Sequence, residues 1–149
     1  MTIEELQLEP IAEQAARLLK QKHPNIEFTS GRRTVAQQAH AMAANIVSLN
    51  DRQWIEKTYL AGAKLQKWVD DHPNAVTVDQ ITAGLLETMN AMTDDERLKI
   101  SRHLTGRAFD VRPVTQNAGA IKADISALPG LQKFLEKEGG HVRWHAQFQ

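Results

Sequence analysis

The sequence predicts a helix-rich α+β protein that forms a single domain over residues 1–149 around a small antiparallel sheet. Apolar residues recur at helical spacing, behind capping boxes, through about the first hundred residues. Short segments of alternating apolar and polar residues lie near both ends, and only three or four strands can be recognised. So few strands do not suit a regular parallel sheet with crossover helices, which favours an antiparallel arrangement.

Most of the chain is expected to be helical. Pro10 suits the first turn of a helix over 9–21. Three capping boxes mark further helix starts, which are Thr34 with Gln37, Thr77 with Gln80, and Thr93 with Glu96. One long helix is predicted over 51–70, so that a helical insertion occupies about 50–100. A last helix is expected to start at Pro129 and to end at Gly139 and Gly140.

The strands are expected over 26–29, 108–112 and 141–148, where apolar and polar residues alternate. The last two of these segments contain Asp110 and two histidines, His141 and His145. A strand places alternate residues on one face, so His141 and His145 share a face but stand about 13 Å apart at ~3.3 Å per residue. Both are therefore not expected to bind one metal ion.

Composition excludes several classes of protein. Lys plus Arg balances Asp plus Glu at 18 each, so net charge indicates no nucleic-acid partner. No apolar segment approaches the 18 residues of a membrane span, and the acidic start, MTIEELQLEP, does not read as a secretory signal. The chain has no cysteine, which excludes disulfides and thiolate metal sites. A metal would have to be bound by histidine and carboxylate.

One segment, 101–111, carries the candidate chemistry. Asp110 lies inside an apolar strand, where an unpaired carboxylate is costly. Either an arginine partner, such as Arg112 or Arg33, or a metal ion would remove that cost. Gly106 permits a turn that brings His103 back over Asp110. Histidine and aspartate are both zinc ligands, and a catalytic zinc takes three protein groups and keeps one position for water.

The same segment resembles the Ser-x-His-x-x-Gly-x-Ala-x-Asp motif of the zinc D-alanyl-D-alanine carboxypeptidases and the phage L-alanyl-D-glutamate endopeptidases. The matching residues are Ser101, His103, Gly106, Ala108 and Asp110. A second family motif, Thr/Ser-Gly-x-Arg-Ser/Thr after the first strand, is similar to residues 30–34, which place Arg33 at the arginine position. The resemblance implies the Hedgehog/DD-peptidase fold, with zinc as cofactor.

The resemblance also implies roles for residues. His103 and Asp110 would bind zinc, Ser101 would lie at the substrate, and Arg33 would bind a substrate carboxylate or the charge that develops on the scissile carbonyl. The family takes its third ligand from a late histidine and its general base from an acidic residue three positions earlier.

Two assignments of the late residues stay open. If His145 is the third ligand, as the preceding Trp144 favours, position 142 is a valine and His141 would have to act as the base. If His141 is the ligand, Glu138 occupies the position of the family's acidic base.

The function implied is a zinc-dependent peptidoglycan peptidase that cleaves an amide bond in the cell-wall stem peptide as a monomer. Without a recognisable signal or wall-binding domain, the chain is similar to a phage endolysin for Gram-negative hosts. Such an enzyme collects in the host cytoplasm and acts in the periplasm once the membrane is opened. The alternative is a catalytically inactive, zinc-containing module that binds peptidoglycan or serves in phage structure.

Overall fold

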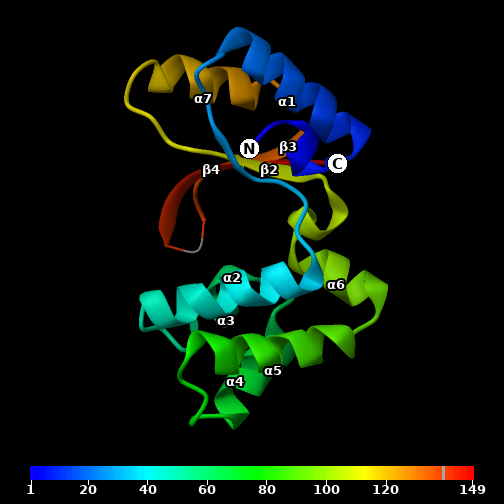
Figure 1. Ribbon diagram of the computed structural model, residues 1–149, viewed down its shortest axis with the longest axis vertical. Helices are drawn as coiled ribbons and strands as arrows, with labels where there is room; N and C mark the ends of the chain where they lie inside the picture. The colour runs from blue at the N-terminus through cyan, green and yellow to red at the C-terminus, as the bar shows by residue number, and fades with distance from the viewer. Residues whose placement is uncertain (139) are drawn as a thin grey trace. The chain divides into compact units, whose positions relative to one another are not determined.

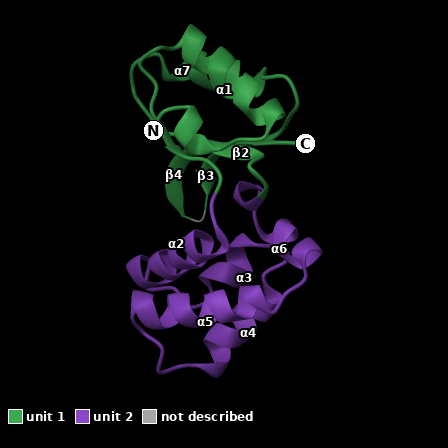
Figure 2. Cartoon of the chain, turned by 45° about the vertical axis from the view of Figure 1, so that its right-hand side comes forward, with its two compact units in different colours: residues 1–32, 105–149 green, residues 33–104 purple. Residues whose placement is uncertain are grey.

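A computed structural model describes residues 1–138 and 140–149. The chain divides into two compact units (Figure 2). One combines residues 1–32 with 105–149 and contains the sheet, and the other spans 33–104 and is helical. The architecture is α+β, as predicted, and the helical insertion is longer than the expected 50–100.

The first unit is an antiparallel sheet with helices on one face. Its elements are η1 (Glu4–Leu6), α1 (Pro10–Lys22), β1 (Phe28–Ser30), β2 (Ala108–Val111), α7 (Ala118–Ser126), β3 (Leu131–Glu138) and β4 (His141–Phe148). Among the described residues the strand order is β1-β2-β4-β3, and every neighbouring pair is antiparallel. Figure 1 shows α1 and α7 side by side along this sheet.

Alternation along the strands builds the core of this unit. Phe109 on β2 and Trp144 and Phe148 on β4 point toward α1 and α7 and are buried. Phe109 packs edge-on to Phe28, with ring centroids 5.3 Å apart. Because the apolar residues of β2 and β4 face the helices, their intervening residues lie on the opposite face, and Asp110 and His145 are among them.

The last predicted helix, over 129–138, is wrong, because this segment forms β3. Leu131, Phe134 and Leu135 have a spacing that suits a helix, but β3 pairs with β4 along its length. Pairing with a distant strand therefore overrides local preference. The expected helix end at Gly139 lies outside the described residues. The chain also forms α7, which the sequence did not predict, because Asn117 at its start makes no side-chain cap.

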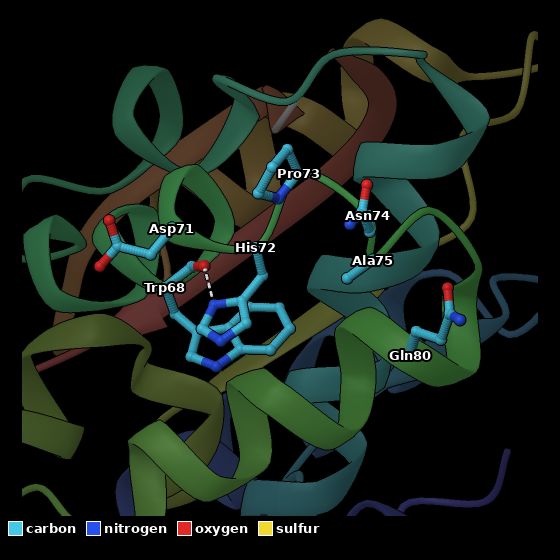
Figure 3. Close-up of a pocket in the computed structure, with 7 residues that line it drawn as sticks. All are labelled: Trp68, Asp71, His72, Pro73, Asn74, Ala75 and Gln80. Carbon is cyan, nitrogen blue, oxygen red and sulfur yellow. Dashed lines mark hydrogen bonds between the residues drawn. The ribbon is translucent and has the colours of Figure 1, made fainter.

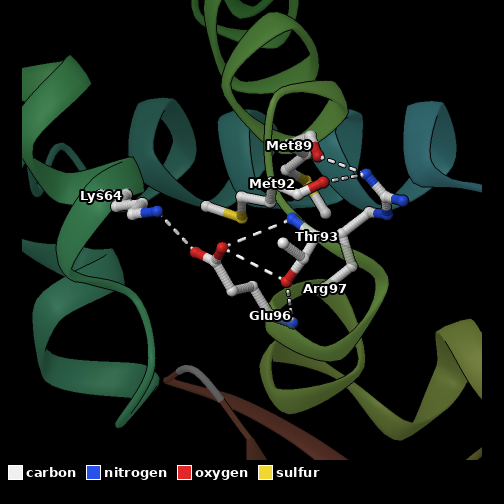
Figure 4. Close-up of polar contacts among 6 residues, drawn as sticks. All are labelled: Lys64, Met89, Met92, Thr93, Glu96 and Arg97. Carbon is white, nitrogen blue, oxygen red and sulfur yellow. Dashed lines mark hydrogen bonds and ion pairs between the residues drawn. The ribbon is translucent and has the colours of Figure 1, made fainter.

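The second unit consists of α2 (Val35–Ser48), α3 (Trp54–Thr58), α4 (Ala63–Asp71), α5 (Val78–Asn90) and α6 (Asp94–Ile100). The three predicted capping boxes are present at the starts of α2, α5 and α6. At the junction of α5 and α6, Arg97 donates to the carbonyls of Met89 and Met92, and Lys64 binds Glu96 at 2.6 Å (Figure 4). Side-chain contacts thus fasten the end of α5 to the start of α6.

The helix predicted over 51–70 is interrupted and forms α3 and α4. The interruption lies at 59–62, where a Cβ on Gly62 would come within 2.7 Å of Ile55 Cγ2. The two helices pack against each other, which a single straight helix could not do. Arg52, just before α3, ties the end of α4 and the following loop to the start of α3 by donating to the carbonyls of Val69, His72 and Ala75. In the part of the chain that the structure describes, no helix has the length and apolarity to cross a membrane.

Candidate metal centre

Asp110 and His145 form the centre of the candidate site. They are direct partners in the β2–β4 ladder, on the face away from α1 and α7. Asp110 is 1% exposed and His145 is 4% exposed. His145 Nδ1 lies 2.8 Å from Asp110 Oδ1. Strand pairing therefore brings together two polar side chains that are 35 residues apart and buries both.

His103 reaches the site from η2 (Arg102–Thr105), the turn that leads into β2. Its side chain is fully buried. The Oγ of Ser101 accepts a hydrogen bond from the His103 backbone N–H at 3.2 Å, and the His103 carbonyl accepts one from Arg33 N–H at 2.9 Å. Gly106 follows with φ +75°, a conformation that favours glycine, so the predicted turn between His103 and Asp110 is present.

Glu138 is the last residue of β3 and adds a second carboxylate. Its Oε2 lies 3.1 Å from His145 Nδ1. The β3–β4 register shifts just before this point: from Leu135↔His145 to Lys137↔Val142 the ladder advances two residues on β3 and three on β4. Such a bulge twists a strand locally and re-aims its side chains.

These four residues form a group that could hold a metal ion. One donor atom from each of His103, Asp110, Glu138 and His145 lies within 4.8 Å of every other. Around a tetrahedral zinc with bonds of about 2.0–2.1 Å, neighbouring donors stand roughly 3.3 Å apart. Two imidazoles and two carboxylates without a thiol are a donor set that fits zinc, and all but the partly buried Glu138 are buried.

The pKa of His145 reflects both its burial and the two carboxylates beside it. Burial is the largest single influence on its pKa and lowers it, because burial disfavours the charged imidazolium. The hydrogen bond to Asp110 and the charges of Glu138 and Asp110 together outweigh burial, so the pKa of His145 lies above its ordinary value. The site therefore favours a positive charge at the position of His145 Nδ1.

The structure separates the two late histidines. His145 belongs to the four-residue group, and the group does not include His141. His141 pairs with Glu138 across the hairpin, and its buried Nε2 has no hydrogen-bond partner among residues 1–138 and 140–149. The group combines His145, the third ligand of one assignment, with Glu138, the acidic residue of the other.

Arg33 precedes α2 and is connected to it. Its Nη1 donates to Gln38 Oε1 at 3.4 Å, and Gln38 Nε2 donates to Tyr59 Oη at 3.2 Å. Gln38 is fully buried, so this polar chain runs through the interior of the helical unit. Of the arginines considered as partners of Asp110, Arg112 binds Glu27 at 3.3 Å on the surface.

Sequence reasoning missed Gln147, which touches the other nitrogen of His145. His145 Nε2 lies 3.0 Å from Gln147 Oε1. The signal was available, because residues two apart on a strand share a face.

The helical unit also carries a surface hollow of about 430 Å³ beside α4 (Figure 3). Trp68 and His72 stack there with ring centroids 4.1 Å apart, and Asp71, Asn74 and Gln80 line the rim. Trp68 is half-buried against Gly84, where a Cβ would overlap the indole.

Comparison with known proteins adds no identification. No family model matches the chain, and no curated protein or solved structure matches it.

Proposed function

We propose that the protein is a zinc-dependent peptidase that cleaves an amide bond in the stem peptide of bacterial peptidoglycan. The observation that carries the proposal is the buried group of His103, Asp110, Glu138 and His145. Two of its members, His103 and Asp110, come from the segment that resembles the motif of zinc cell-wall peptidases. The group offers what that chemistry needs: three ligands for a metal and a carboxylate beside them.

In this proposal His103, Asp110 and His145 hold the ion, and Glu138 serves as general base and acid. Zinc, when bound, polarises the peptide carbonyl and makes a water molecule acidic enough to lose a proton near neutral pH. Glu138 accepts that proton and later delivers it to the leaving amine. Because one of its oxygens lies within 4.8 Å of the other three donors, the Glu138 carboxylate stands no more than about one water molecule away from them.

Arg33 has the role of binding a substrate carboxylate or stabilising the charge that develops on the carbonyl oxygen. Its backbone hydrogen bond to the His103 carbonyl places it beside the turn that carries a ligand, and Gln38 restrains its guanidinium. Ser101 supports the same turn through the His103 N–H and is proposed to lie at the substrate.

The biological setting that we propose is phage lysis. The protein would collect in the host cytoplasm, meet the wall from the periplasmic side once the inner membrane is opened, and act as a monomer on the stem peptide.

One observation favours a second function, a zinc-containing module that binds peptidoglycan or serves in phage structure without turnover. Glu138 Oε2 is 3.1 Å from His145 Nδ1, as close as two ligands of one ion. If Glu138 is a fourth ligand, the site is closed, as structural zinc sites are.

The test is mass spectrometry of products from purified Gram-negative peptidoglycan, with zinc content measured on the same protein. We expect new termini at one amide bond, which disappear with a chelator and return with zinc. His103→Ala should lose zinc and activity, whereas His40→Ala, at an exposed position on α2, should keep both. Zinc without turnover would support the second function, and a folded protein that binds no zinc would overturn both.

A further inference from the structure

The outer nitrogen of His145 belongs to a chain of two glutamines. His145 Nε2 lies 3.0 Å from Gln147 Oε1, and Gln147 Nε2 donates to Gln132 Oε1 at 2.8 Å. The inner nitrogen, Nδ1, lies against the carboxylates of Asp110 and Glu138. Both ring nitrogens therefore face hydrogen-bond acceptors, which are carboxylate oxygens at Nδ1 and an amide oxygen at Nε2.

The direction of this chain determines which nitrogen carries hydrogen. Because the amide nitrogen of Gln147 donates to Gln132, its amide oxygen is the atom that faces His145. An amide oxygen only accepts hydrogen bonds, so Nε2 of His145 carries a hydrogen. The hydrogen that a metal ion would replace is therefore the one on Nδ1, which faces Asp110 Oδ1 at 2.8 Å and Glu138 Oε2 at 3.1 Å.

Two features of the strands bring these side chains together. His145 and Gln147 share one face of β4 because they are two residues apart. On β3, the ladder advances from Leu131↔Phe148 to Lys133↔Gln147, two residues against one, so Gln132 is an extra residue in a bulge. A bulge re-aims a side chain out of the regular alternation, and here Gln132 reaches Gln147.

We propose that Gln147 is the positioning residue that makes His145 a metal ligand through Nδ1, and that Gln132 holds Gln147 in that orientation. This inference rests on the proposed metal site and adds residues that the family resemblance does not supply. A ligand histidine whose second nitrogen is bound by a fixed acceptor keeps one tautomer and one ring orientation, which raises its affinity for the metal. Gln147 touches the ligand directly, whereas the Gln147–Gln132 bond is exposed, so Gln147 should matter more.

The experiment measures zinc affinity by competition with a chromogenic chelator, on the full chain, and the His145 tautomer by ring-nitrogen NMR of the zinc-loaded protein. We expect Gln147→Leu to bind zinc about 10–100-fold more weakly than the wild type. Gln147→Glu restores an acceptor and should keep affinity at or above the wild-type value. Gln132→Ala should lower affinity by a smaller factor, and Gln149→Leu, an exposed terminal glutamine, should leave it unchanged.

The outcomes separate this inference from the proposed function. If the wild type binds no zinc, the metal site itself is refuted. If the wild type binds zinc but Gln147→Leu binds it equally well, or the wild-type spectrum shows hydrogen on Nδ1 of His145, the inference alone is overturned. The tautomer is read from the wild type, so the test holds even if Gln147→Leu does not fold.

Discussion

Replacing Glu138 with glutamine probes the proposed chemistry most directly. The substitution keeps the volume of the side chain and removes its charge and basicity. Because one carboxylate oxygen of Glu138 lies within 4.8 Å of the donors of His103, Asp110 and His145, we propose that Glu138 transfers the proton. Loss of a general base lowers kcat by about 10²–10⁴, which corresponds to roughly 3–5 kcal/mol of barrier. The assay is the rate of release of new peptide termini from peptidoglycan at saturating zinc.

The matched control is Glu136→Gln on the same strand. Glu136 is exposed and binds Lys122 at 2.7 Å on the surface, so its loss should change neither rate nor zinc affinity. Zinc affinity measured on Glu138→Gln separates the two functions. Retained zinc with a large loss of kcat supports the peptidase, and a loss of zinc makes Glu138 a ligand and favours the binding module. Unchanged rate and unchanged affinity would refute the reasoning from geometry.

The remaining predictions concern stability and pH. A Cβ at Gly84 would lie 1.9 Å from Trp68 Cζ2, so Gly84→Ala should lower the free energy of unfolding by about 1–3 kcal/mol in urea titrations. Gly119, also in a helix, has open space at its Cβ, and Gly119→Ala should instead stabilise by about 0.5–1 kcal/mol; equal effects would contradict the packing argument. Two hydrogen bonds to its carboxylate, the larger influence from Lys64 and the smaller from the Thr93 backbone N–H, lower the pKa of Glu96 below its usual value of 4.5. The stabilisation from the ionised Glu96 carboxylate is therefore complete above pH 4.5, and it is lost as the pH falls through the lowered pKa. Urea titrations across this acidic range should show a weaker pH dependence for Glu96→Gln, and an unchanged slope would count against the contact.

Local signals predicted the capped starts of α2, α5 and α6, but they missed α7 and predicted a helix where β3 lies. A capping box such as Thr34 with Gln37 is made by residues three apart, so the sequence alone specifies it. The segment 131–138 carries helical spacing, yet it is a strand because β4 offers a partner along its whole length. The residues within 131–138 do not by themselves show that β4 will pair with them.

The candidate site also contains residues that near neighbours in the sequence predict and residues that only strand pairing places. His103 and Asp110 were predicted together because Gly106, at φ +75°, turns the chain between them. The choice between His141 and His145 depends on register, because only the pairing of β2 with β4 decides which histidine lies opposite Asp110.

The sequence by itself determined the α+β class, the capped helices, the absence of thiolate ligands and the local His103–Asp110 pair, since each depends on composition or on near neighbours. Tertiary structure alone decided that β3 is a strand, that Glu138 and His145 join the group, and that Gln147 touches the outer nitrogen of His145. The physical reason is that strand pairing and bulges place side chains by register between distant segments, and a shift of one residue would turn His145 from one face of the sheet to the other.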